Sequence, residues 1–368
     1  MSQTLQLVIL ERGSFAVKDS CSCHDWEVRM DYLNNDKSSF RLSSSIRADK
    51  GDFVLAKMGS GKYSAILRNG RLKPFYFGIV ESNELKENET ELFSVSLYNL
   101  VNFDFPATKK SGKNVQAHMK TLLDVFLFRD GTKKADSISV RVDGEPISYS
   151  YQPSDPPTVT NMVEYFINIF KKYGVVWEVE WVGYDDAGQF VVSTVIGSKS
   201  DVLRFKNNVA DFQNWSVEVT REGYASENMV VIVDKETSDS ESPRILSTWY
   251  INGDREITQS DVGVATPTRS KIYIYDTKGE DKPSYQSVAR SELSGSLYSH
   301  NISCDVSRNS QLLPFSLVEI GKQCDIYYDT ERFLSILTGY SLRSDSGVIS
   351  LTFGYIRNTL KNLLIQGG

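Results

Sequence analysis

The C-terminal part of the chain has the clearest alternation of hydrophobic and polar positions. Three runs rich in β-branched and aromatic residues, 317–328, 333–342 and 348–354, are separated by polar turns that contain Asp, Ser and Gly. In the last run, Ile349, Leu351 and Phe353 alternate with polar or smaller residues, namely Val348, Ser350 and Thr352. A period of two places these sets on opposite faces of a strand. The pattern predicts a meander of antiparallel strands.

A fainter copy of this pattern occurs near the N-terminus, in the runs 51–56, 75–80 and 92–98. In both copies a Gly precedes the first strand, a second Gly interrupts the middle strand, and an alternating strand follows. The two glycines are 27 residues apart in the first copy and 18 in the second. A Gly inside a strand often marks a bulge or a barrel corner, so we predict two related small β-barrels. The structural barrel positions that we expect to matter are Gly51, Phe77, Gly78, Ile79, Gly321, Gly339, Tyr340, Phe353 and Gly354.

Between the two copies the spacing of apolar residues becomes helical. One helix is predicted after Asn114, a suitable N-cap. A second is expected to begin at Thr158 or Thr160 and to end at Gly174, where a left-handed C-terminal residue belongs. A hairpin follows, with strands at 175–182 and 190–196. These elements predict an α+β insertion, held apart from the barrels.

The predicted fold class is therefore mainly β with an α+β insertion, built from two related small β-barrel domains plus inserted domains. We expect residues 1–105 to form the first barrel and residues 106–205 the α+β insertion. The second barrel is expected to contain residues 206–235 and 285–368, with a small β insertion at 236–284.

Size, charge and cysteine content narrow the class of protein. A length of 368 residues allows two to four domains. The net charge of −6 argues against non-specific attraction to nucleic acid phosphates, but it is compatible with a passage through which DNA slides. No run of about 18 apolar residues predicts a membrane span. Four cysteines are too few for a disulfide framework in this length, which favours synthesis in a reducing cytoplasm.

Motifs for catalysis or metal binding are incomplete. Residues 59–62 resemble the end of a phosphate-binding loop, but Tyr63 stands where the magnesium-binding hydroxyl belongs. Cys21, Cys23 and His24 are close in sequence, whereas a tetrahedral zinc site needs four ligands at compatible spacing. We therefore expect cysteines that are buried or half-buried in strands, and no catalytic, metal or cofactor site.

Aromatic residues in the predicted hairpin allow two interpretations. Trp177, Val179 and Trp181 fall on one face if the strand is regular. An exposed face of this kind would suit a sugar-binding platform. The favoured interpretation is a core face packed on the preceding helix.

The chain resembles the hub proteins at the tip of phage tails, called tail-associated or tail-tip proteins in siphophages. It is also similar in design to the central baseplate hub proteins of contractile-tailed phages. The resemblance rests on the order barrel, insertion, barrel and on five segments, 51–54, 77–80, 321–326, 337–340 and 351–364. It covers nearly the whole chain in architecture.

This resemblance implies a homotrimer in which each chain contributes two tube-like barrels, so that three chains present six similar barrels to the sixfold tail tube. The insertions would close the distal end of the tail and rearrange when DNA leaves. The implied partners are the distal tail protein, receptor-binding and baseplate proteins, and the end of the tape-measure protein. The implied location is the virion, after synthesis in the host cytoplasm, with no stable membrane insertion.

Many relatives carry a lytic or adhesive domain after the second barrel. The fifteen residues that follow Phe353 leave no room for one, so we expect no enzyme activity. Two other functions stay open from the sequence: a carbohydrate-binding β-domain adhesin, and a cell-wall hydrolase. The oligomeric mass separates the hub from the adhesin, and a zymogram tests for the hydrolase.

Overall fold

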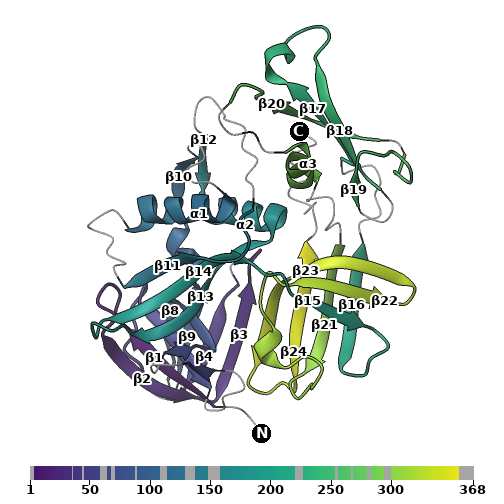
Figure 1. The fold of residues 1–368 in the computed structure, drawn as a ribbon. Helices are drawn as coiled ribbons and strands as arrows, with labels where there is room; N and C mark the ends of the chain where they lie inside the picture. The colour runs from purple at the N-terminus through teal and green to yellow at the C-terminus, as the bar shows by residue number, and fades with distance from the viewer. Residues whose placement is uncertain are drawn as a thin grey trace.

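The computed structural model describes residues 4–355, except for residues 35, 44, 59–63, 68–70, 88, 108–113, 129–136, 148–157, 220–226, 253–255, 267, 280–281, 283 and 294–299. The fold is mainly β with helical insertions, as predicted. Two β-rich modules lie side by side at the bottom of Figure 1, and two insertions lie above them. Within the described ranges, no helix is long and apolar enough to cross a membrane.

The first module is an antiparallel sheet of seven strands with the order β2-β1-β5-β8-β9-β4-β3. One face of the sheet surrounds a core that contains Leu7, Trp26 and Phe40. Strand β5 is buried on both faces, since Val54 and Ala56 belong to this core and Phe53 and Leu55 to a second one. The strands are β1 (Leu5–Leu10), β2 (Val17–Cys23), β3 (Asp25–Asp31), β4 (Ser38–Leu42), β5 (Phe53–Met58), β8 (Tyr76–Leu85) and β9 (Thr90–Ser96).

The second module has six strands with the order β15-β22-β23-β24-β21-β16. The predicted C-terminal meander forms its centre, since β22, β23 and β24 pair in succession. Its strands are β15 (Val202–Lys206), β16 (Phe212–Val219), β21 (His300–Ser307), β22 (Gln323–Tyr328), β23 (Glu331–Arg343) and β24 (Val348–Tyr355).

The two modules share one strand order. Matching β5, β8 and β9 to β22, β23 and β24 also matches β4 to β21 and β3 to β16, with every pairing antiparallel in both modules. The outermost counterparts differ in direction, because β1 pairs antiparallel with β5 whereas β15 pairs parallel with β22. The predicted relation between the two ends of the chain is therefore visible in the strand pairing.

Backbone hydrogen bonds fix this correspondence to single residues. The amide of Gly51 donates to the carbonyl of Val80 at 2.9 Å, and the amide of Gly321 donates to the carbonyl of Leu337 at 2.8 Å. Both glycines have positive φ, +95° and +88°. One residue further on, each middle strand has a β-bulge, between Val80 and Ser82 in β8 and between Leu337 and Gly339 in β23.

The in-strand glycines are not counterparts, which corrects the predicted alignment. Gly78 pairs with Val54 and corresponds to Ser335, which pairs with Cys324. Gly339 corresponds to Ser82, the first paired residue after the bulge. The two glycine spacings, 27 and 18 residues, differ in part because the second glycine of each pair occupies a different position in its strand. In addition, β6 (Ala65–Ile66) and β7 (Leu72–Lys73) lie between β5 and β8 and pair within another sheet.

A seam joins the modules into one continuous sheet. The second half of β23 pairs antiparallel with β3, in a register that runs from Gly339 opposite Asp31 to Arg343 opposite Glu27. The first half of β23 pairs with β22 along the same edge. One buried apolar cluster accordingly contains residues of both modules, including Trp26 and Phe353.

The first insertion packs directly on the first module. Its sheet has the order β11-β14-β13-β7-β6, and its buried residues share a core with Phe53, Phe77 and Ile79 of the first module. The expectation that it is held apart is therefore wrong. The remaining elements are β10 (Asp104–Ala107), α1 (Val115–Leu123), β11 (Ile138–Val142), β12 (Thr158–Asn161), α2 (Met162–Tyr173), β13 (Val175–Tyr184) and β14 (Phe190–Ser198).

The predicted helix ends are partly correct. The Asn114 side chain accepts a hydrogen bond from the Ala117 amide, as an N-cap does, and Gly174 ends α2 in the left-handed region at φ +65°. The cap of α2 is Asn161, the last residue of β12, whose side chain accepts a hydrogen bond from the Val163 amide. Thr158 and Thr160 lie earlier in that strand, so the predicted cap is wrong.

The second insertion is wider than the predicted range 236–284. Its sheet has the order β19-β18-β17-β20, and helix α3 packs on it. Strand β17, placed by the prediction in the second barrel, pairs with β18 and β20 instead. The elements are β17 (Met229–Asp234), β18 (Ile245–Ile251), β19 (Ile257–Thr258), β20 (Ser270–Tyr275) and α3 (Tyr285–Leu293). Similarly, β15 lies in the range predicted for the α+β insertion but belongs to the second module.

We expect Phe353→Ala to lower the free energy of unfolding by about 3–5 kcal/mol. Phe353 is fully buried, and its ring centroid lies 4.8 Å from that of Phe205. Chemical denaturation measures the change. Leu312→Ala is the control, since this side chain in the same module is 64% exposed. A loss below about 1 kcal/mol for Phe353→Ala would contradict the assignment of Phe353 to the core.

Candidate functional site

The predicted barrel positions fall into three places. Gly339 and Tyr340 lie in the seam. Phe77 and Ile79 face the first insertion, and Gly78 lies between them, where an added Cβ would be 2.5 Å from the Val95 carbonyl oxygen. The others stabilise single modules or contact the insertion: Gly51, Gly321, Phe353 and Gly354.

Gly339 is required where the two modules approach each other. An added Cβ would lie 2.8 Å from the carbonyl oxygen of Met30 in β3 and 2.8 Å from Oγ1 of Thr352 in β24. Real Cβ atoms essentially never come within 3.0 Å of such neighbours. The glycine therefore allows β23 to be sandwiched between a strand of its own module and a strand of the other.

Gly321 has a comparable role against the first insertion. Its φ is +88°, and an added Cβ would lie 2.9 Å from Cγ1 of Val176 in β13. The second module and the insertion therefore touch at this glycine.

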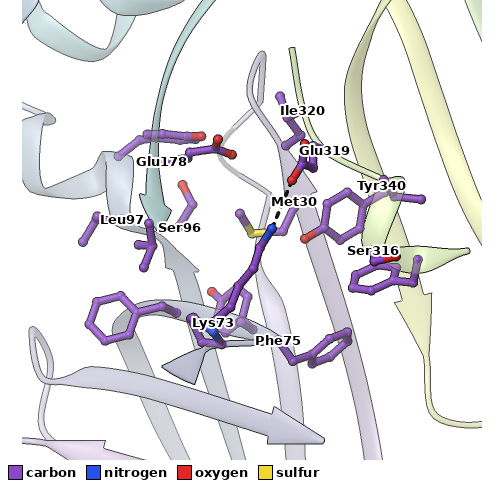
Figure 2. Close-up of a pocket in the computed structure, with 17 residues that line it drawn as sticks. Met30, Lys73, Phe75, Ser96, Leu97, Glu178, Ser316, Glu319, Ile320 and Tyr340 are labelled. Atoms are coloured by element: carbon purple, nitrogen blue, oxygen red, sulfur yellow. Dashed lines mark hydrogen bonds and ion pairs between the residues drawn. The ribbon is translucent and has the colours of Figure 1, made fainter. Parts of the chain in front are cut away.

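The modules and the first insertion meet around one cavity, shown in Figure 2. Met30 and Phe75 come from the first module, Glu178 from β13, and Tyr340 from the second module. Phe77 also lines the cavity, so the structure brings together two of the predicted positions, Phe77 and Tyr340. We call this meeting point the junction.

Aromatic residues pack together at the junction, where Tyr98 and Tyr340 line the cavity and buried Tyr32 lies in the same apolar cluster. The ring centroids of Tyr32 and Tyr98 lie 4.4 Å apart, and the Tyr32 hydroxyl accepts a hydrogen bond from the amide of Trp177 at 3.2 Å. Burial raises the pKa of Tyr32, Tyr98 and Tyr340 above the ordinary tyrosine value. These hydroxyls therefore stay protonated at neutral pH, and Tyr32 accepts the Trp177 bond as a neutral group.

A network of charged residues forms the rim of the junction. Lys73 of β7 contacts Glu319 at 3.0 Å, a contact drawn in Figure 2, and buried Lys322 contacts the same carboxylate at 3.3 Å. In the insertion, Glu178 pairs with Lys199. The contacts of Glu319 therefore join β7 to the second module, while the Glu178–Lys199 pair lies within the first insertion, near enough for the charges of Lys73 and Glu319 to act on Glu178.

The carboxylates of this network differ in their environments. Burial raises the pKa of Glu178 above its ordinary value. Burial alone would also raise the pKa of Glu319, but the positive charge and hydrogen bond of Lys73 outweigh it and lower that pKa. Glu319 is accordingly the carboxylate that stays ionised and holds the two lysines.

The aromatic face of β13 is a core face, as the favoured interpretation predicted. Trp177 is fully buried, and its indole nitrogen donates to Oγ1 of Thr194 at 2.9 Å. A bulge between Val179 and Trp181 turns Trp181 to the other side, where the Arg71 guanidinium stacks on it at 4.1 Å. The three residues do not form an exposed platform for a sugar.

The cysteines lie in strands. Cys21 is half-buried, whereas Cys23, Cys304 and Cys324 are buried. Burial raises the pKa of the Cys21 thiol to about 11 and that of Cys23 to about 12. Within the described part of the chain, no three His, Cys, Asp or Glu side chains cluster as a metal site. The segment 59–63 that resembles a phosphate-binding loop lies outside the described residues.

Sequence reasoning missed the seam and the charged network. One signal for the seam was present, because Trp26-x-Val28 in β3 recurs as Trp215-x-Val217 in β16, its counterpart. The charged network has no local sequence signal, since its members are far apart along the chain and only the fold brings them together.

Comparison with solved structures shows which proteins share this architecture. No protein family model matches the sequence, and no curated protein sequence matches it significantly. A chain of the p2 virion baseplate in its activated conformation is 12% identical with a TM-score of 0.52, over 96% of this chain and all of that one. The chain shares its fold with phage tail and baseplate proteins.

Two further solved tail proteins have this fold. The tail protein from Neisseria meningitidis MC58 is 12% identical with a TM-score of 0.52, over 95% of this chain and 96% of that one. The 43 kDa tail protein of prophage MuSo2 from Shewanella oneidensis is 11% identical with a TM-score of 0.51, over 96% and 98%. The tail-protein fold thus extends over nearly the whole of each chain, insertions included.

We expect Gly339→Ala to lower the free energy of unfolding by about 1–3 kcal/mol, because the added methyl group collides with both neighbours of β23. Thermal or chemical denaturation measures this loss. Gly347→Ala is the matched control, since nothing lies within 4 Å of its Cβ position. Equal effects of the two substitutions would show that close approach at the seam does not constrain the fold.

We expect Glu319→Gln to lower the free energy of unfolding by about 1–3 kcal/mol at neutral pH, because buried Lys322 loses its nearest carboxylate. Asp345→Asn is the control, since this exposed carboxylate pairs with exposed Arg343, and such a surface pair contributes at most about 0.5 kcal/mol.

The pH dependence distinguishes an ionic from a purely steric role of Glu319. Its pKa lies below the ordinary 4.5 in the folded state, so its contribution is complete above about pH 4.5 and is lost as the pH falls through the lower folded value. The stability difference between wild type and Glu319→Gln should therefore shrink below about pH 4.5. A difference that is constant down to pH 3 would contradict the ionic role.

Proposed function

We propose that this chain is the structural hub of a phage tail tip or baseplate. The tail-protein fold over the full length supports this function, although a fold by itself can host several functions. The observation that carries the proposal is the internal duplication, since one chain contains two modules with the same strand order and the same bulge.

A duplicated module gives a physical reason for a homotrimer. A closed ring needs subunits that present alike surfaces to their neighbours. Three chains with two modules each supply six similar surfaces, which match a sixfold tail tube. A chain with a single module would reach the same ring only as a hexamer.

In this role the two insertions close the distal end of the tail. Both lie on one side of the pair of modules in Figure 1, which leaves the opposite side free to meet the tube. The partners are the distal tail protein on the tube side, receptor-binding and other baseplate proteins around the insertions, and the end of the tape-measure protein. The protein is then a virion component, made in the host cytoplasm, and it rearranges to let DNA pass without specific binding.

The hub role requires no catalysis. The junction does not favour an adhesin or a cell-wall hydrolase, because the phenylalanines that line it are buried and Glu178 and Glu319 pair with lysines. A cleared zone in a zymogram of the purified protein would contradict a purely structural role.

We expect the purified protein to have three times the chain mass of 41.5 kDa. Multi-angle light scattering after size-exclusion chromatography measures this mass over a range of concentrations. A species that stays at one chain mass at every concentration would overturn the trimeric hub, whereas a simple adhesin need not be a trimer.

A further inference from the structure

Two strand edges lack a partner strand in the described part of the chain. β8 pairs with β9 as far as Leu85, but on its other side it pairs with β5 only up to Ile79. The edge of β8 from Ser82 to Leu85 therefore has no neighbouring strand there. β16 pairs with β21 on one side, and no described strand pairs with its other side. Unpaired edges of this kind offer backbone donors and acceptors to another chain.

These two edges are the counterparts of the two edges that meet in the seam. β3 corresponds to β16, and the second half of β23 corresponds to β8 beyond its bulge. In the seam, β3 and β23 pair antiparallel. Each module therefore has one edge like that of β3 and one edge like that of β23. Within the chain, the first module pairs through its β3 edge and the second module through its β23 edge.

The correspondence can be followed residue by residue. Leu342 in β23 corresponds to Leu85, because both lie three positions after the first paired residue that follows the bulge. In the first module, Glu27 pairs with Ser39. In the second module, Ser303 corresponds to Ser39 and pairs with Ser216, so Ser216 corresponds to Glu27. Val28 and Arg29 therefore correspond to Val217 and Glu218.

We infer that β16 of one copy pairs antiparallel with residues 83–86, the last three residues of β8 and the residue that follows it, in a second copy. This inference rests on the proposed ring of modules and specifies its contact between chains. The register repeats that of the seam and places four residue pairs opposite each other: Lys86 with Ser216, Leu85 with Val217, Glu84 with Glu218, and Asn83 with Val219. The contact is head-to-tail, and with the rotation of the proposed ring it gives a closed assembly in which the modules alternate.

The apolar residues at these edges support the contact. Leu85 is 72% exposed, whereas its counterpart Leu342 is 1% exposed and lies opposite fully buried Val28. Val217 and Val219 line a hollow beside Tyr328, which leaves space for an incoming side chain. Pairing between copies would cover Leu85 with Val217 as the seam covers Leu342 with Val28.

The charges at these edges make the register testable. In the seam, Arg29 lies opposite Ser341. In the inferred contact, the corresponding residues are Glu218 and Glu84, two exposed carboxylates. Like charges directly opposite each other weaken a strand pair, and opposite charges strengthen it.

Disulfide formation between copies tests the register directly. The variant combines Leu85→Cys and Val217→Cys with Cys21→Ser, which removes the one half-buried native cysteine. Residues directly opposite in an antiparallel pair have Cα atoms about 4.5–5.5 Å apart, within the range of a disulfide. Oxidation should give covalent trimers on a denaturing gel, which reduction reverses. The control variant with Glu84→Cys and Val217→Cys places the two thiols on opposite faces and should remain uncrosslinked.

A double-mutant cycle with charge-reversing substitutions provides a second test that needs no cross-link. Glu218→Arg and Glu84→Arg should each lower the dissociation constant of the trimer by a factor of about two to five, because each creates an opposite-charge pair. The double variant faces Arg with Arg and should return toward the wild-type value. If the two single effects simply add in the double variant, the residues do not face each other and the register is wrong.

The outcomes separate this inference from the proposed function. A trimer that cross-links at 85 and 217 and shows the charge coupling supports both. A trimer that does neither overturns the inferred contact and leaves the trimeric hub standing. A protein that stays monomeric in light scattering overturns the hub and the contact together.

Discussion

The pairing of β3 with β23 is the interaction on which the rest of the structure depends. It places a strand of the N-terminal module against a strand near the end of the chain and so makes one sheet of two modules. Backbone hydrogen bonding of this kind tolerates little variation in distance, and Gly339 supplies the space that it needs. Because the seam fixes the modules relative to each other, the first insertion can pack against both, and the junction can form where the three parts meet.

The junction gives the insertion a defined position on this frame. Aromatic packing around Tyr32 holds it by apolar contact, and the charged network around Glu319 adds polar contacts at the rim. The two kinds of contact differ in how readily they are broken. Rim ion pairs respond to pH and salt, whereas the buried aromatic contacts do not.

The sequence predicted much of the fold because alternation and helical spacing are local properties. The C-terminal meander, both helices of the insertion and the resemblance between the ends of the chain were all found in this way. Module membership was predicted less well. Strands β15 and β17 alternate like any other strand, and alternation does not specify the sheet to which a strand belongs. The glycines were also noted, but the neighbours that require Gly339, Met30 and Thr352, are known only from the fold. The repeated Trp-x-Val of β3 and β16 was the one local signal that pointed to equivalent edges.

Electron cryo-microscopy of the purified assembly tests the central claim most directly, because it shows how the modules of different copies are arranged. The account predicts a closed ring with true threefold symmetry, in which first and second modules alternate and the sheet continues from β16 of each copy into β8 of the next. An assembly in which first modules contact first modules, or in which those two strand edges face solvent, would contradict it.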